Sequence, residues 1–201
     1  MIVVLMTSRS GSSLVCGILA AHGLKWSDGK NDPMGAGGGK PIYRAFENTT
    51  IKRTMAKIPN GKSPRGDIVP VTNTAIDIMK KVMATQDVDF VKSSAEYVDI
   101  WQAWSECVRV PVHFIKVYRP PEDILESWYR RNKGDRADAE KVIRKRMKIM
   151  DDVEGRFIAT NMLMDYEDWG MSGIKDAFKY CGVEFDPYLA DAVIKPEVFT
   201  T

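Results

Sequence analysis

The stretch MTSRSGSSLVCGILAAHG, residues 6–23, decides the fold of this chain. It follows the apolar run MIVVL and places four Ser, one Thr, one Arg and one Gly in positions 7–13. The run IVVLM does not alternate, which predicts a short strand buried on both faces. The residues after the polar segment predict a buried helix from Ser12 to about His22, with Gly23 as its C′ residue. A strand that passes through a loop directly into a helix is typical of the first half of a βαβ unit.

The remainder of the chain repeats this alternation of strand and helix patterns. Further strands are predicted at 88–92 and 110–118, and the Pro-Pro pair at 120–121 predicts a helix start. The other predicted helices cover 43–58, 73–85, 96–107, 136–158, 172–182 and 187–194, and loops are predicted at 27–41 and 59–67. Together these patterns predict one α/β domain over residues 1–201, with a central, mostly parallel sheet flanked by helices.

Composition and charge exclude several classes of protein. The 201 residues are 44% hydrophobic and 28% charged, and a net charge of +2 is too small to indicate a nucleic-acid partner. No apolar run approaches the roughly 18 residues of a membrane span, and residues 1–23 lack the basic start of a signal peptide. Cys16, Cys107 and Cys181 fit no metal or disulfide spacing, which predicts a reducing, cytoplasmic setting.

The polar loop between the predicted strand and helix is expected to bind an anion. In open α/β sheets ligands lie at the carboxyl ends of the strands, where a helix N-terminus offers N–H groups and a positive dipole end. The groups offered here are the side chains of Arg9, Ser10, Ser12 and Ser13 and the backbone N–H groups of residues 10–14, which include Gly11 and Leu14. A Ser-rich turn that only caps a helix is the alternative, but such a cap needs one Ser and no Arg.

Comparison with the nucleotide-binding P-loop, G-x-x-x-x-G-K-[ST], narrows the anion. With the second glycine aligned on Gly11, Met6 replaces the first glycine and Ser12 replaces the lysine, while Ser13 fits. The strand VDFVK also ends in Lys and supplies no Asp to hold Mg²⁺. The sequence therefore predicts a P-loop NTPase-like three-layer fold without the usual contacts to a triphosphate.

Two motifs resemble the sulfotransferases that use 3′-phosphoadenosine-5′-phosphosulfate (PAPS). Residues 7–13, TSRSGSS, resemble the family's phosphosulfate loop, in which Lys or Arg precedes Ser-Gly and two hydroxyl residues. Residues 117–128, VYRPPEDILESW, resemble its 3′-phosphate site, an Arg at a strand end followed eight residues later by a helical Ser; here these are Arg119 and Ser127. A third segment, MLMDYEDW at 162–169, resembles the YEDL-type segment, to which we give a structural role.

The resemblance implies roles for individual residues. It implies PAPS as cofactor, adenosine 3′,5′-bisphosphate as product, no metal, and Arg9 at the bridging oxygen and the 5′-phosphate. Lys92 corresponds to the Lys of a Lys-Thr-His arrangement, whereas Ser94 replaces the His, so the His base does not carry over. Other branches use a carboxylate after the first loop as the general base; Glu47 is the first candidate here and Glu96 the reserve. A surface lysine and a surface ion pair are the alternatives for Lys92 and Glu47.

The function predicted from the sequence is sulfuryl transfer from PAPS to a hydroxyl or an amine. The resemblance implies an acceptor among small molecules, carbohydrates, lipids or peptides, shaped by the loops at 27–41, 59–72 and 130–138. Two alternatives stay open at this point: a P-loop kinase-like phosphotransferase, and a non-catalytic nucleotide-binding module on the same fold. Neither the acceptor nor the oligomeric state follows from the sequence.

Overall fold

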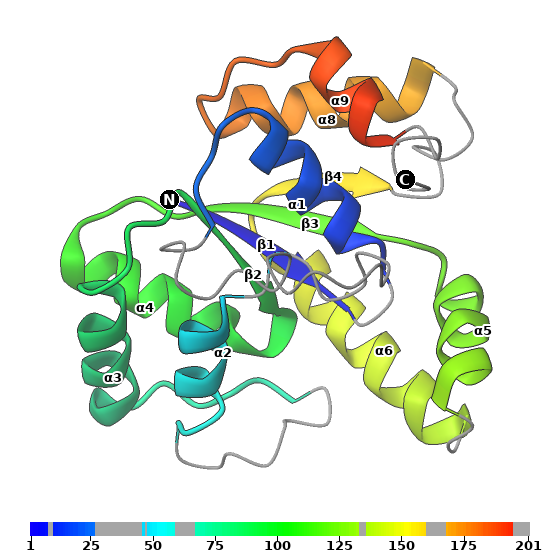
Figure 1. Ribbon diagram of the computed structural model, residues 1–201. Helices are drawn as coiled ribbons and strands as arrows, with labels where there is room; N and C mark the ends of the chain where they lie inside the picture. The colour runs from blue at the N-terminus through cyan, green and yellow to red at the C-terminus, as the bar shows by residue number, and fades with distance from the viewer. Residues whose placement is uncertain are drawn as a thin grey trace, which may run out of the picture.

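A parallel sheet forms the centre of the molecule (Figure 1). The computed structural model describes residues 1–7, 10–26, 46, 48–58, 67–132, 136–159 and 168–194. Within this part of the chain, four strands pair in parallel in the order β2-β1-β3-β4. The strands are β1 (Ile2–Met6), β2 (Phe90–Ser94), β3 (His113–Tyr118) and β4 (Arg156–Ala159). The predicted α/β fold with a parallel sheet is confirmed.

Helices cover both faces of this sheet. On one face lie α1 (Ser12–Ala21), α8 (Asp168–Tyr180) and α9 (Pro187–Ile194). On the other lie α2 (Thr49–Met55), α3 (Asn73–Met83), α4 (Val98–Val108) and α6 (Arg136–Asp151). The 3-10 helix η1 (Ala95–Tyr97) joins β2 to α4, and α5 (Pro121–Asn132) packs against α6. None of the helices described is both long and apolar enough to cross a membrane.

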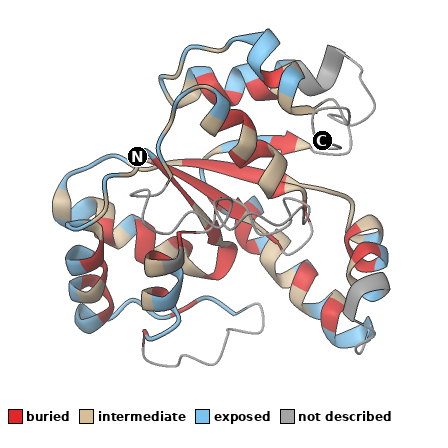
Figure 2. Cartoon of the chain, viewed as in Figure 1, coloured by how far each residue is buried: buried red, intermediate tan, exposed pale blue. Residues whose placement is uncertain are grey.

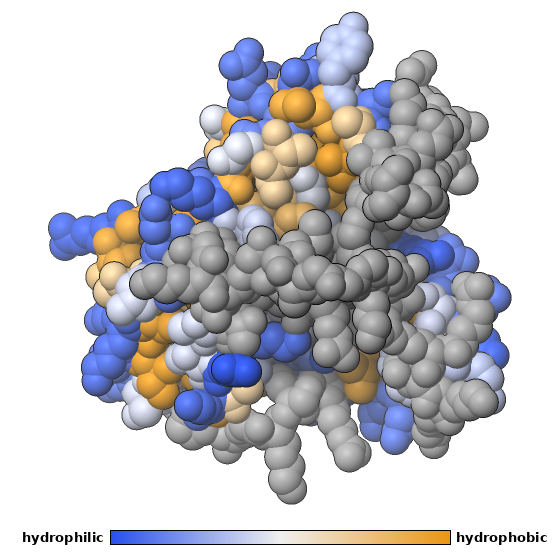
Figure 3. Space-filling view, in the orientation of Figure 1, coloured by the Kyte–Doolittle hydropathy of each residue, from blue (hydrophilic) through white to orange (hydrophobic). Residues whose placement is uncertain are grey.

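The strand β1 is the most enclosed element of the sheet. Val3, Val4 and Leu5 are fully buried because β1 lies between β2 and β3 and under helices on both faces. This placement explains why its sequence does not alternate. Figure 2 shows the buried residues along the strands and on the inward faces of the helices, and Figure 3 shows apolar side chains gathered over the layer of α1, α8 and α9.

The helix α1 ends where the sequence predicts. Gly23 has a φ of 82°, and its N–H donates to the carbonyl of Ala20, which closes the last turn. His22 then joins α1 to the segment before α9: its Nδ1 lies 2.7 Å from the carbonyl oxygen of Ile18, and its Nε2 accepts from the backbone N–H of Asp186 at 3.0 Å. The end of α1 is therefore bound to its own last turn and to a second element.

Two strands begin later than predicted. β2 begins two residues later, because Asp89 is held by Lys25: the N–H of Asp89 donates to the carbonyl of Lys25, and its carboxylate accepts from the N–H of Lys25. As a correction, Lys92 lies in the middle of β2 and not at its end. β3 begins at His113 rather than at residue 110, because Pro111 has no N–H to donate to a neighbouring strand.

The predicted helix 136–158 is wrong in its last third. The helix α6 ends at Asp151, and β4 occupies residues 156–159. Gly155 gives the physical reason, since a Cβ there would lie 2.5 Å from the carbonyl oxygen of Phe114. The chain thus passes closely against β3 at this point, as a strand must do before it joins the sheet.

Two other helices have different starts. The helix predicted from Ser172 begins at Asp168, so Ser172 is an exposed interior residue and not a cap. Of the helix predicted over 43–58, the structure describes α2 over Thr49–Met55, and the side chain of Asn48 caps its start by accepting the backbone N–H of Ile51. The predicted loops at 27–41 and 59–66, and residues 162–167, lie outside the described residues.

Candidate functional site

The candidate site lies at the carboxyl edge of the sheet. Since all four strands are parallel, the segments that follow them meet at one edge, and the register places Met6 between Ser94 and Val117. The central strand β1 has β2 on one side and β3 on the other. A parallel sheet whose connections diverge to two sides of one strand binds ligands at that point.

The N-terminus of α1 lies directly after the polar loop that follows β1. Gly11 precedes the helix with φ 85° and ψ 9°, the left-handed region in which glycine carries no steric penalty. Among the described residues no side chain caps α1, whereas side chains of Asn48 and Thr72 cap α2 and α3. The N–H of Leu14 donates to the carbonyl of Gly11 at 2.9 Å, so this donor takes part in the first turn. The positive end of α1 therefore lies at the sheet edge without a side-chain acceptor from this part of the chain.

The serines of the loop differ in their surroundings. Ser10 is fully buried, and the buried Ser12 donates from Oγ to the sulfur of Met6 at 3.3 Å. Ser13 is half-buried, and its Oγ accepts from the Nζ of Lys92 at 2.9 Å. Ser13 and Lys92 are 79 positions apart in the sequence, and both were predicted to belong to the site; the structure brings them into contact.

Lys92 reaches the loop from the neighbouring strand. It pairs in register with Val4, a residue of the apolar cluster beneath α1, so its side chain lies on the face that α1 covers. The hydroxyl of Thr7 adds a further polar group at the start of the loop: it is buried and has no hydrogen-bond partner within the described ranges. A buried hydroxyl of this kind is unusual in a protein interior.

The second predicted motif has the expected context of strand and helix. Arg119 follows the last residue of β3, and Ser127 is buried in α5, the helix that begins at Pro121. The Nε of Arg119 lies 3.7 Å from a carboxylate oxygen of Asp123, with 29% of the arginine side chain exposed. The guanidinium is therefore at the surface of the sheet edge, beside an acidic partner.

Of the two candidate bases, Glu47 and Glu96, the structure describes only Glu96. Glu47 lies outside the described residues, as does Arg9. Glu96, in η1, is fully buried. Its Oε1 accepts from the Nε of Arg146 at 2.5 Å, and its Oε2 accepts a hydrogen bond from the hydroxyl of Ser94. The carboxylate of Glu96 is therefore closed to solvent, whereas Ser94, which donates to it, is half-buried.

The fold described above is shared with a solved structure. No protein-family model matches the chain, and no curated protein matches its sequence. Among solved structures, the sulfotransferase domain from the Synechococcus PCC 7002 olefin synthase matches with a TM-score of 0.56 and 18% identity. This match covers 100% of the chain and 78% of that domain. The chain has the fold of a sulfotransferase domain.

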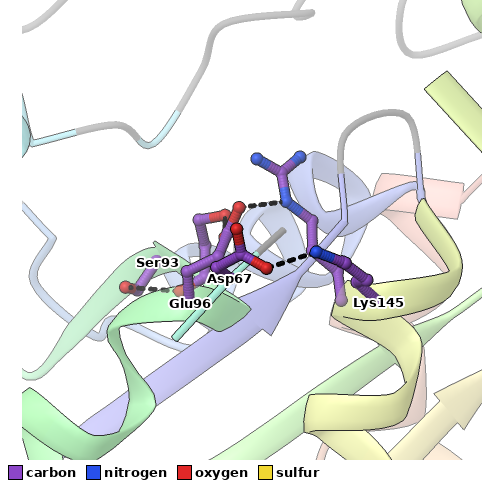
Figure 4. Close-up of polar contacts among 6 residues, drawn as sticks. Asp67, Ser93, Glu96 and Lys145 are labelled. Carbon is purple, nitrogen blue, oxygen red and sulfur yellow. Dashed lines mark hydrogen bonds and ion pairs between the residues drawn. The ribbon is translucent and has the colours of Figure 1, made fainter. Parts of the chain in front are cut away.

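A cluster of polar contacts supports the edge of this sulfotransferase fold. Figure 4 shows Asp67, Ser93, Glu96 and Lys145 together beside the end of β2. Lys145 of α6 pairs with Asp67, and the carbonyl of Glu96 accepts from the N–H of Val69 at 2.8 Å. The segment before α3, the turn after β2 and the helix α6 are therefore joined at one place.

Burial in this cluster changes the titration of Tyr97. Desolvation raises the pKa of its phenol, and the neighbouring carboxylate of Glu96 raises it further, while Arg146 acts in the opposite direction. The phenol therefore keeps its proton at neutral pH.

Sequence reasoning missed Arg146 as part of this edge. It lies in the run RKRMK of the strongly charged helix α6, where nothing in the sequence separates an inward arginine from its exposed neighbours. Only the contact with a buried carboxylate singles it out, since buried charges are almost always paired.

Proposed function

We propose that this chain is a sulfotransferase that moves a sulfuryl group from PAPS to a hydroxyl or amine of an acceptor, in line and without a metal. The observation that carries the proposal is the contact between Lys92 and Ser13 at the N-terminus of α1. It brings a cation onto a helix end that already favours negative charge, which suits a phosphosulfate. The shared fold supports the same assignment.

Each motif has a proposed task. The N–H groups and hydroxyls of residues 10–14 bind the 5′-phosphosulfate, with Arg9 at the bridging oxygen. Charge develops on that oxygen as its bond to sulfur breaks, and Lys92, which contacts Ser13 of the loop, is proposed to offset part of this charge. Arg119 and Ser127 bind the 3′-phosphate, one from the end of a strand and the other from the next helix. All of these contacts belong to a single domain over residues 1–201.

The acceptor must lose a proton during transfer, and the proposed base is a carboxylate. Glu47 is the first candidate and Glu96 the second. The acceptor is a hydroxyl or amine of a small molecule, carbohydrate, lipid or peptide.

Titration with adenosine 3′,5′-bisphosphate in the presence of EDTA tests the proposal. We expect calorimetry to detect tight binding that Arg9→Ala abolishes and that Arg119→Ala and Ser127→Ala weaken. Adenosine 5′-monophosphate is the matched control ligand, because it lacks the 3′-phosphate and its affinity should not respond to Arg119→Ala. Absence of bisphosphate binding overturns the proposal, and Mg²⁺-dependent binding of ATP in its place assigns the chain to the phosphotransferases.

A further inference from the structure

Ser94 occupies a position at the sheet edge from which it can meet the acceptor. It is the last residue of β2 and is paired in register with Met6, the last residue of β1. Side chains alternate along a strand, so Ser94 and Lys92 lie on the same face. Because Lys92 contacts Ser13, Ser94 lies on the loop side of β2, one step closer to the edge.

The hydrogen bonds of Ser94 fix the direction in which its hydroxyl points. Its Oγ donates to Oε2 of Glu96, and a carboxylate can only accept. Arg146 holds the other oxygen of this fully buried carboxylate. The proton of Ser94 is thus directed inward to Glu96, and toward a ligand its oxygen can act only as an acceptor.

We infer, on the basis of the sulfotransferase function proposed above, that Ser94 and Glu96 together take the proton of the acceptor. The acceptor oxygen forms a bond to sulfur while the bond from sulfur to the 5′-phosphate oxygen breaks, and that electron pair leaves with the bisphosphate. The proton of the acceptor moves to Oγ of Ser94, and the proton of Ser94 moves to Oε2 of Glu96. Solvent takes up this proton after the products leave.

The proton transfer from the acceptor needs only a weak base. Group transfers of this kind pass through a loose transition state, so the acceptor oxygen loses its proton late, when the bond to sulfur has made it strongly acidic. Arg146 holds Oε1 of Glu96, which leaves Oε2 to receive the proton from Ser94. The pair of Ser94 and Glu96 and the residue Glu47 are alternatives for a single role, and the experiment separates them.

The test measures single-turnover transfer from PAPS to water, which needs no knowledge of the natural acceptor. Ser94→Ala should lower the rate about a hundredfold, in the usual range for a lost acid–base group, while Ser94→Thr keeps the hydroxyl and most of the rate. Glu96→Gln should lower the rate by as much. Arg146 donates and so binds the amide oxygen, which leaves the amide nitrogen facing Ser94, and this nitrogen cannot accept a proton. Affinity for adenosine 3′,5′-bisphosphate should stay the same in all three variants.

Ser93→Ala is the matched control on the same strand. Ser93 lies on the opposite face, where its Oγ accepts from Nε1 of Trp101 at 2.9 Å, so its loss should affect stability but not the rate. The rate in mixtures of H₂O and D₂O adds a readout that a structural role would not change. Two protons in flight give a curved dependence on the D₂O fraction, which Ser94→Ala should abolish.

Each outcome either supports the proton-accepting role of Ser94 and Glu96 or contradicts it. Equal rates in Ser94→Ala and the unmodified chain overturn the inference, and a loss confined to Glu47→Gln gives the proton to Glu47 instead. If Glu96→Gln does not fold, the comparison of Ser94→Ala with Ser94→Thr still decides. If the unmodified chain neither binds the bisphosphate nor consumes PAPS, the proposed function fails together with the inference.

Discussion

The Nζ of Lys92 lies 2.9 Å from the Oγ of Ser13, so a cationic side chain of β2 contacts the residues that follow the neighbouring strand β1. This contact joins two segments that share no local sequence pattern. The positive end of α1 and the ammonium group of Lys92 both favour negative charge at this loop.

Replacement of Lys92 by Met tests the value of this charge. Met keeps much of the length but removes the ammonium group, and a hydrogen bond to a charged group contributes about 1.5–3 kcal/mol. We therefore expect the affinity for PAPS to fall about ten- to a hundredfold in calorimetry. Lys25→Met is the control, because Lys25 pairs with the exposed Asp87. A similar loss in both variants would contradict a specific role for Lys92.

The ion pair between Arg119 and Asp123 predicts an unusual gain. Asp123 lies 3.7 Å from the guanidinium proposed to bind the 3′-phosphate, and its charge repels that phosphate. Exposed pairs of this kind contribute about 0–1 kcal/mol, so their loss costs little stability. Asp123→Asn should tighten the binding of adenosine 3′,5′-bisphosphate a few-fold, roughly 1 kcal/mol or less, and leave adenosine 5′-monophosphate unaffected. Weaker bisphosphate binding would place the 3′-phosphate elsewhere.

Arg9→Lys separates charge from geometry at the loop. Lysine keeps the positive charge but lacks the planar fork that binds two phosphate oxygens at once. We expect binding of PAPS to be intermediate between the unmodified chain and Arg9→Ala, as measured by calorimetry. If Arg9→Lys binds as tightly as the unmodified chain, Arg9 acts as a charge alone.

The cysteines should differ in their reactivity with iodoacetamide. Burial raises the pKa of Cys181 to about 11. Because the thiolate is the reactive form, Cys181 should remain unlabelled at pH 8 and gain reactivity as the pH rises toward that value. Cys107 is exposed and should be labelled first, as followed by peptide mass spectrometry. Equal labelling of Cys107 and Cys181 at pH 8 would contradict this prediction and show that Cys181 is open to solvent. The unfolded chain is the control, because both cysteines should be labelled there at the same rate.

His22→Phe tests the junction between α1 and α9. Phenylalanine keeps the ring contact with Phe178 but leaves the N–H of Asp186 without its acceptor. This hydrogen bond is exposed, so water can replace the lost acceptor; its loss should cost about 0.5–1.5 kcal/mol and lower the melting temperature by a few degrees. Tyr188→Ala, at a side chain that is 84% exposed, should leave the melting temperature nearly unchanged. The absence of a drop in His22→Phe would show that the hydrogen bond is dispensable.

The first elements were predictable because their signals are local. A buried central strand has an unbroken apolar run, Gly23 marks the end of α1, and a Pro-Pro pair marks the start of α5. β4 gave no such signal: it has four residues, and Arg156 and Phe157 are exposed, so neither alternation nor an apolar run identifies it. Short edge strands take their identity from the neighbour with which they pair.

The candidate site was predictable in its parts but not in its contacts. The order and spacing of the loop and of Arg119 pointed to one edge, since parallel strands end together. The partners Lys92 and Ser13 lie 79 positions apart, and Glu96 and Arg146 lie 50 apart, so pairing them needed the tertiary structure. The sequence identified Glu96 as a candidate base, but only the structure shows that Glu96 is buried and hydrogen-bonded to Ser94.

These long separations have a consequence for how the molecule forms. Contacts between distant residues are made late in folding, because a long loop must close before they contribute. A chain is synthesised from its N-terminal side, so the loop at 10–14 leaves the ribosome before Lys92 and Arg146 have been synthesised. This loop is therefore synthesised before the strand and the helix that surround it in the folded domain, and the nucleotide affinity proposed above should arise in the nascent chain only after α6 has emerged.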